Sequence, residues 1–238
     1  MNKKFKPFYI KEMNCTCSKS ECPQSKKDFK SGWVPRGFSP QNSNTAKILV
    51  VGKNPGHPFK EEKLLYKGKR GKNLLRAKEK WNSLKCEMIL SNLKEFHSIK
   101  DKSLIYHMNI RRYLRYFLGL SKKLETYKEY LTNYKPDYEK EISEHVAFTN
   151  LFKCSTKCER EKIKDTSFEN CYEKYFKEEI KLIKPKTIIA LGKEVKKFLD
   201  SKQLKVIYIK HPSYFYRIND ELDILRNKKK ELRKRLNH

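Results

Sequence analysis

The chain has 238 residues, 37% of them hydrophobic and 35% charged, which is enough for one large domain with a core beneath a heavily solvated surface. Lys and Arg number 56 against 28 Asp and Glu, a formal net charge of +28 that attracts polyanions such as nucleic acid, although Lys-rich compositions also arise without any DNA role. No apolar run approaches the roughly 20 residues that span a bilayer, and no apolar stretch follows the N-terminal lysines, so we expect a cytoplasmic protein without a membrane segment or a secretory signal.

The first half of the chain combines an irregular arm, one strand and a long helical region. Residues 1–45 contain turn signals and three cysteines but no strong periodicity, and we interpret them as an arm with a short helix, held down by something other than a core. Ala46–Gly52 is predicted to be a buried strand, followed by a Gly-Lys-Asn-Pro-Gly turn. Residues 60–144 are predicted to form a helical insertion, whose helices the periodicity does not place relative to the strands.

The second half alternates strands with helices. Short apolar runs predict strands at His145–Leu151, Thr187–Leu191 and Lys205–Ile209. Apolar residues at helical spacing predict helices at Asn170–Lys184, which ends before Pro185, and at Gly192–Leu199. The last segment, 219–238, is predicted to be a basic helix.

This alternation favours an α/β fold: a three-layer α/β/α domain with a central four-stranded parallel sheet, spanning 1–238 as a single domain. Ligands of such sheets bind at the loops that follow the carboxyl ends of the strands. The chemically rich segments lie there, since Gly52–Pro58, Asn150 and His211–Arg217 each follow a predicted strand. We therefore expect these three segments to surround one site.

Four motifs in this order carry a family resemblance. Residues 51–56 (Val-Gly-Lys-Asn-Pro-Gly) resemble the first motif of the uracil-DNA glycosylase superfamily, in its Gly-x-Asn-Pro-Gly form, and residues 210–213 (Lys-His-Pro-Ser) resemble the second. Residues 148–154 resemble the segment that carries the uracil-reading Asn. Residues 179–192, with Lys-Pro-Lys leading into Ala-Leu-Gly, are similar to the iron–sulfur (family 4-like) branches.

The resemblance implies a uracil-DNA glycosylase-like fold and hydrolysis of the N-glycosidic bond of uracil, or of another deaminated base, in base excision repair. His211 is the candidate for stabilising the departing base, and a neutral imidazole suffices for that hydrogen bond. Asn54 is the candidate for positioning water. An amide orients water without taking its proton, so hydrolysis is expected to be slower than in relatives with Asp at this place. Asn150 is the candidate reader of uracil, because an amide offers one donor and one acceptor.

Further residues are expected to contact the substrate. Phe59, with Tyr66 in reserve, is the candidate for stacking on the base. Lys53 either reaches a phosphate or is simply solvated, and Ser213 is expected to bind a backbone phosphate. The remaining candidates are Gly52, Pro55 and Gly56 beside the base, and Tyr214, Tyr216 and Arg217 on the DNA, single- or double-stranded.

Seven cysteines in a reducing compartment point to metal or cluster ligation rather than disulfides. The resemblance to the iron–sulfur branches implies a [4Fe–4S] cluster that pins the N-terminal arm, and structural zinc remains the alternative. The predicted ligands are Cys17, Cys22, Cys154 and Cys171, with Cys15 as an alternative at the N-terminal side and Cys158 at the other.

Two other readings stay open at this level. Because the first motif has Asn54 in place of Asp, together with Lys53, the chain could be a nucleic-acid-binding iron–sulfur protein that keeps the fold without catalysis. It could also be a structural iron–sulfur or zinc component of a nucleic-acid assembly. Base and strand preference and oligomeric state are not readable from the sequence.

Overall fold

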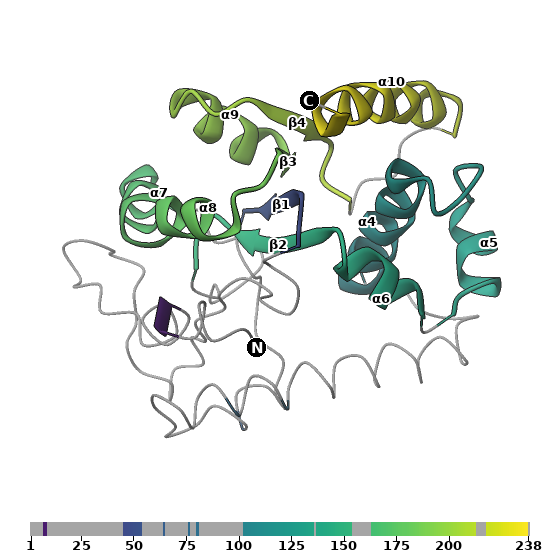
Figure 1. The fold of residues 1–238 in the computed structure, drawn as a ribbon, viewed down its shortest axis with the longest axis horizontal. Coiled ribbons are helices and arrows are strands. Elements are labelled where there is room, and N and C mark those ends of the chain that lie inside the picture. The colour runs from purple at the N-terminus through teal and green to yellow at the C-terminus, as the bar shows by residue number, and fades with distance from the viewer. Residues whose placement is uncertain are drawn as a thin grey trace.

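The computed structural model describes residues 7–8, 45–53, 64, 76, 80, 102–135, 137–153, 163–212 and 218–237. At its centre is a four-stranded sheet in the order β2-β1-β3-β4, in which every neighbouring pair is parallel (Figure 1). The strands are β1 (Ile48–Gly52), β2 (Val146–Asn150), β3 (Thr187–Leu191) and β4 (Val206–Ile209). All four predicted strands are confirmed, within two residues at each end.

The apolar composition of β1 and β3 explains why these two strands are at the centre of the sheet. Every residue of β1 and of β3 is buried, which the continuous apolar runs of these segments anticipate for strands covered on both faces. The outer strands β2 and β4 alternate partly between buried and half-buried positions. Ile48 of β1 lies between Val146 and Thr187, so the three strands begin level with one another.

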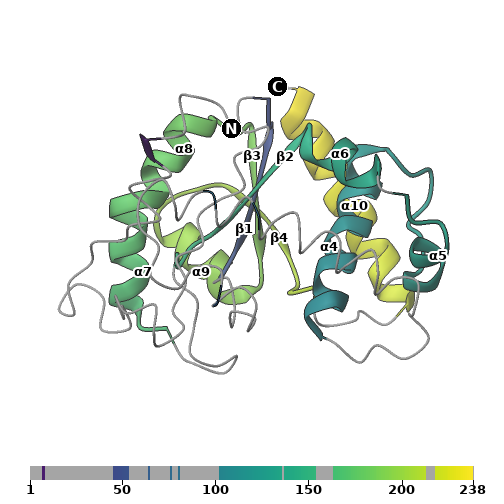
Figure 2. The same ribbon diagram turned by 90° about the horizontal axis from the view of Figure 1, so that it is seen from below.

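Helices cover both faces of the sheet and complete the predicted three layers. Figure 2 shows the sheet nearly edge-on, with α7, α8 and α9 on one side and α4, α5, α6 and α10 on the other. Alternate residues of β1 enter the two cores: Leu49 and Val51 pack with the first helix group, and Ile48 and Val50 with the second. The helices on the second face are α4 (Lys102–Leu118), α5 (Tyr127–Thr132), α6 (Asp137–Ser143) and α10 (Ile218–Asn237).

The helical stretch before β3 begins earlier than predicted. It comprises α7 (Asp165–Cys171), the π-helical turn η2 (Tyr172–Phe176) and α8 (Lys177–Ile183). The sequence prediction began at Asn170, where the apolar face starts, because residues 165–167 are polar. Lys164 occupies the N-cap position and makes no capping hydrogen bond with its side chain, and lysine is not a residue that marks a helix start in a sequence. At the other end, Lys184 adopts a left-handed conformation with φ 51° ahead of Pro185, and the helix stops as predicted.

The prediction for Gly192–Leu199 is confirmed with a small shift, since α9 spans Lys193–Ser201. Gly192 at its N-cap position has φ 93°, a conformation that a residue with a Cβ rarely adopts.

Within the described ranges, no helix is long and apolar enough to cross a bilayer. The assignment of 1–238 to a single domain stays a prediction.

The order of the strands fixes where a ligand can bind. From β1 the chain passes through α4, α5 and α6 to β2 on one side, whereas β3 and then β4 lie on the other side of β1. The direction of winding therefore reverses between β1 and β3. In open parallel sheets the crevice outside the carboxyl ends of the strands at such a point is the usual ligand site.

Candidate functional site

The carboxyl ends of β1 and β2 lie side by side at this edge of the sheet. Gly52 pairs with Asn150, and the chain continues the pairing beyond both strands, because Leu151 and Phe152 donate backbone hydrogen bonds to the carbonyls of Gly52 and Lys53 at 2.8 and 2.9 Å. A Cβ placed on Gly52 would lie 2.7 Å from Oδ1 of Asn150. The Asn150 amide therefore rests directly on the glycine, and any side chain at position 52 would displace it.

His211 follows β4 and lies against the residues after β3. A Cβ on Gly192 would lie 3.7 Å from the Cβ of His211 and 3.8 Å from its Cδ2, so the imidazole packs on the turn that starts α9. The other neighbour of His211 is Tyr106 of α4, whose ring centroid lies 5.1 Å from that of the imidazole at an interplanar angle of 34°. His211 is thereby held between two elements from opposite faces of the sheet.

Tyr106 links the two halves of the site. Its hydroxyl oxygen lies 3.6 Å from the position of a Cβ on Gly52, and its ring contacts His211. Burial raises the pKa of Tyr106 to about 12, against a smaller opposing effect of the Arg111 charge. The phenol is therefore protonated at any working pH, and its ring contacts His211 while its hydroxyl lies beside Gly52.

The electrostatics around His211 favour the neutral imidazole. Burial lowers its pKa from the ordinary value of 6.5, and the positive charge of Lys53 lowers that pKa further. Lys53 itself forms an ion pair with Glu194 in the first turn of α9, with 2.5 Å between Nζ and Oε2. The sequence analysis did not anticipate this pairing, and a contact of Lys53 with a phosphate stays a prediction.

We expect Lys53→Met to raise the pKa of His211, because it removes the cation that opposes protonation. The measurement is an NMR titration of the imidazole, whose midpoint lies below 6.5 in the unsubstituted protein and moves upward in the variant.

The same shift makes stability depend on pH. Because the pKa of His211 is lower in the folded protein than in the unfolded chain, the unfolded chain binds more protons as the pH falls through 6.5. The free energy of unfolding therefore falls there, and it falls less in the variant.

Lys197→Met is the matched control for this titration. Lys197 is an exposed residue of the same helix, α9, one turn beyond the Lys53–Glu194 pair. Its removal lowers the net charge by the same amount and should leave the midpoint of His211 in place. Equal shifts in both variants would mean that net charge alone sets the pKa, and that the proximity of Lys53 has no specific effect.

The other predicted contact residues lie outside the described residues. They are Asn54, Pro55, Gly56, Phe59, Tyr66, Ser213, Tyr214, Tyr216 and Arg217. Of the three segments expected to surround one site, the described residues bring Gly52, Asn150 and His211 together through Tyr106. The position of the Asn54 side chain stays a prediction, although its neighbour Lys53 is at the site.

Of the predicted cluster ligands, Cys171 alone belongs to the described residues. It is 1% exposed and packs in the core on the α7 side of the sheet. The sequence analysis placed it at the start of a helix, whereas it is the last residue of α7, because the helix begins five residues earlier than predicted. Cys15, Cys17, Cys22, Cys154 and Cys158 lie outside the described residues. Among the described residues, no three His, Cys, Asp or Glu side chains form a metal site.

Two functional candidates were missed by the sequence analysis, Tyr106 and Glu194. Tyr106 belongs to the 60–144 region, whose helices could not be placed, so nothing in the sequence brought it near His211. Glu194 precedes the buried Val195 in α9 and resembles any solvated residue of a helix start. Its significance follows only from the ion pair with Lys53.

Fold and site together define a doubly wound α/β protein with a polar site at the point where the winding reverses, lined by an amide, a phenol and a neutral imidazole. The model of the uracil DNA glycosylase superfamily matches residues 40–238, which covers every described strand and all but two described residues. The chain therefore belongs to the uracil DNA glycosylase superfamily, a group of DNA glycosylases. No curated protein matches the chain.

Proposed function

We propose that the protein hydrolyses the N-glycosidic bond of uracil, or of another deaminated base, in DNA. The observation that carries this proposal is the convergence of Asn150, Tyr106 and His211 at the carboxyl edge of the sheet. Superfamily membership supports the class of reaction. The net charge of +28 suits a polyanionic substrate, because phosphate contacts supply most of the affinity for DNA.

Asn150 would select the base. An extruded base presents its Watson–Crick edge to a pocket, and uracil there offers the O4 acceptor and the N3–H donor. The Asn150 amide supplies the complementary donor and acceptor. Because Gly52 has no side chain, the Asn150 amide can lie directly over it. Cytosine presents the opposite donor and acceptor pattern, which a flipped amide would accommodate, so Asn150 alone gives incomplete discrimination.

His211 would stabilise the leaving group. When the bond between C1′ and N1 breaks, its electron pair stays on the base, and negative charge spreads from N1 to O2. A neutral imidazole donates a hydrogen bond to O2, and preorganised donors of this kind lower the barrier most where charge develops. The low pKa of His211 keeps the imidazole neutral, so the donor exists without a proton being transferred to the base.

Water then adds to C1′ and leaves its proton to solvent or to the departing base, which restores a neutral abasic sugar. Asn54 would orient that water, as the first motif implies. Phe59 would stack on the base, Ser213 would bind a phosphate beside the extruded nucleotide, and Tyr214, Tyr216 and Arg217 would contact the DNA around the vacated stack. These roles rest on the matching motifs, since the residues lie outside the described ranges.

The test is a panel of oligonucleotides that carry uracil in single strands, uracil opposite guanine or adenine, hypoxanthine or xanthine. After incubation with the protein, alkali cleaves the strand wherever a base has been removed. Strand breaks at uracil support the proposal, and the panel gives base and strand preference. Tight binding without breaks for every substrate would overturn it in favour of the inactive nucleic-acid-binding protein.

We further propose that four cysteines, Cys17, Cys22, Cys154 and Cys171, with Cys15 as an alternative, hold a structural [4Fe–4S] cluster or a zinc ion. The argument is the chemistry of the donor set, since thiolates suit both groups, and the position of Cys171 beside the sheet. Metal analysis of anaerobically purified protein should give iron, with absorbance near 400 nm, or zinc. Cys171→Ser should lower the metal content, and a metal-free unsubstituted protein would contradict the proposal.

A further inference from the structure

Helix α4 makes a second contact with the His211 segment, one residue beyond the imidazole. Asn109 is 0% exposed, and its Nδ2 donates a hydrogen bond of 2.8 Å to the carbonyl oxygen of Pro212. The two residues are 103 positions apart in the chain. Tyr106 and Asn109 are three residues apart in α4 and share a helix face, so one face contacts both His211 and Pro212.

The carbonyl of Pro212 is an effective point at which to hold this loop. The proline ring already fixes φ of residue 212, and the peptide bonds on either side are planar. A hydrogen bond to the carbonyl oxygen therefore fixes the one soft backbone dihedral that remains at this residue. Pro212 is the residue next to His211, so a constraint on Pro212 also limits how the backbone of His211 can move.

The Asn109 amide is itself held in one orientation. Nη2 of Arg112 donates to Oδ1 of Asn109 at 3.2 Å, and Arg112 is 4% exposed. A guanidinium group only donates hydrogen bonds, so the amide must turn its oxygen toward Arg112 and its nitrogen toward Pro212. Nη1 of Arg112 donates a hydrogen bond of 2.6 Å to the carbonyl of Glu125, beyond the end of α4.

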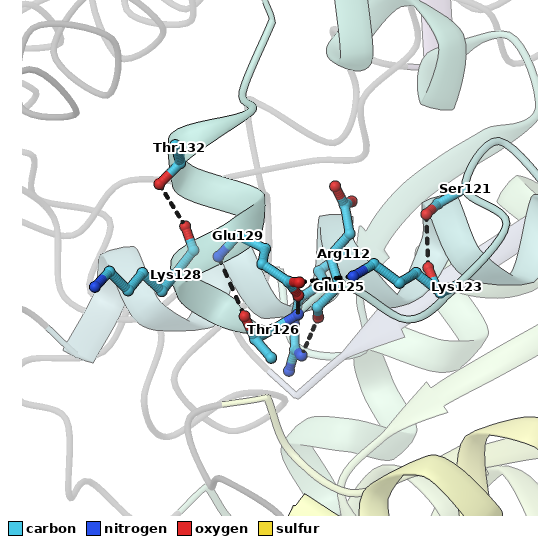
Figure 3. Close-up of polar contacts among 8 residues, drawn as sticks. All are labelled: Arg112, Ser121, Lys123, Glu125, Thr126, Lys128, Glu129 and Thr132. Carbon is cyan, nitrogen blue, oxygen red and sulfur yellow. Dashed lines mark hydrogen bonds and ion pairs between the residues drawn. The ribbon is translucent and has the colours of Figure 1, made fainter.

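Figure 3 shows the hydrogen bond from Arg112 to Glu125, together with the polar contacts of the turn between α4 and α5. The backbone N–H of Thr126 donates to Glu129 Oε2 at 2.7 Å, and that of Glu129 donates to Thr126 Oγ1 at 3.2 Å, a reciprocal capping box that starts α5. Lys123 adds an ion pair to Glu129 at 2.7 Å. The Glu125 carbonyl therefore projects from a fixed turn toward Arg112.

We propose that Asn109 is a positioning residue for His211, oriented by Arg112 and by the corner between α4 and α5, and that it acts through the carbonyl of Pro212. This inference rests on the proposed function, since it assigns Asn109 to the same catalytic histidine. Asn109 does not touch the base. Its effect is to place the imidazole where charge develops on the base, and a displacement of about 1 Å there costs about 10²-fold in rate.

The test is Asn109→Asp, which keeps the size of the side chain and its acceptor for Arg112 but replaces the Nδ2 donor with an oxygen facing the Pro212 carbonyl. We expect the single-turnover rate of uracil release to fall at least about tenfold, with the Kd for DNA within about twofold of the unsubstituted value. The His211 imidazole resonances should shift in the same variant. Asn133→Asp, the same change at an exposed position of the α4–α5 region, is the control and should alter neither.

Arg112→Lys is the second variant, in case Asn109→Asp fails to fold. It keeps the charge but loses one of the two hydrogen bonds that orient the amide, so a smaller loss of rate with the same shift of the His211 resonances is expected. Unchanged His211 resonances in a folded variant would overturn the proposal. So would a loss of DNA binding that accounts for the whole loss of rate. If the unsubstituted protein releases no uracil, the proposed function fails, whereas the His211 resonances still decide whether Asn109 positions the imidazole.

Discussion

Replacing His211 with alanine should lower the single-turnover rate of uracil release by about 10²–10³-fold, equivalent to about 2.7–4 kcal/mol of transition-state stabilisation. The reason is that the imidazole is proposed to donate its neutral N–H to O2, where negative charge develops in the transition state. The bond is made to the departing base, so the unreacted DNA should gain little from it. The measurement is a single-turnover time course on a uracil-containing oligonucleotide, with the Kd for the same DNA determined separately.

His145→Ala is the matched control. His145 is exposed and precedes β2 at the opposite, amino edge of the sheet, where its backbone carbonyl accepts hydrogen bonds from Lys47 and Ile48. Its side chain should be dispensable for both rate and binding. A His211→Ala variant that retains more than a tenth of the rate would remove the imidazole from the mechanism, even if the protein proves to be a glycosylase.

The sheet and its site edge were predictable because they depend on local features of the chain. A dense apolar run such as Ile48–Val51 has no stable place except a strand buried on both faces, and alternation with helices makes the sheet parallel. Parallel strands bring their carboxyl ends to one edge. Gly52, Asn150 and His211 were therefore placed near one another by topology alone.

The partners of these residues were not predictable, because they come from helix faces. Tyr106 and Asn109 belong to a helix in which apolar and basic residues alternate closely, and periodicity leaves open which face meets the sheet edge. Only the packing of α4 against the second face of the sheet brings both residues to His211 and Pro212. The ion pair of Lys53 with Glu194 likewise joins the ends of two strands that are distant in sequence.

A buried charge pair that contacts Thr149, the residue before Asn150, also escaped the sequence analysis. Lys153 and Glu179 are both 0% exposed, and Nζ of Lys153 lies 2.6 Å from Oε1 of Glu179. Nζ also donates a hydrogen bond of 2.7 Å to the hydroxyl of Thr149, which lies 3.0 Å from both oxygens of the carboxylate. Lysine and glutamate are expected to be solvated by default, and here the ion pair and the hydrogen bonds with Thr149 offset the cost of burying both charges.

Lys153→Met should lower the free energy of unfolding by about 3–5 kcal/mol, because it leaves the Glu179 carboxylate buried without its cation. Such a loss is a large share of the roughly 5–15 kcal/mol that stabilises a typical domain. The free energy is measured by urea unfolding followed by circular dichroism. The variant should also lose uracil recognition as it loosens, since Thr149 immediately precedes Asn150 in β2.

The double variant Lys153→Met/Glu179→Met decides whether the unpaired charge is the cause. If it is, removing the second charge restores most of the lost stability, because two apolar side chains can replace a buried ion pair at little cost. Two results would mean that other groups satisfy the Glu179 carboxylate. One is that the losses of unfolding free energy from the two substitutions simply add in the double variant. The other is that Lys153→Met alone loses less than about 1 kcal/mol. A third outcome is a double variant with restored stability but poor uracil release. In that variant the core is intact, and the hydrogen bond from Lys153 to Thr149 is missing. The result would mean that the charge pair helps to hold Asn150 in position.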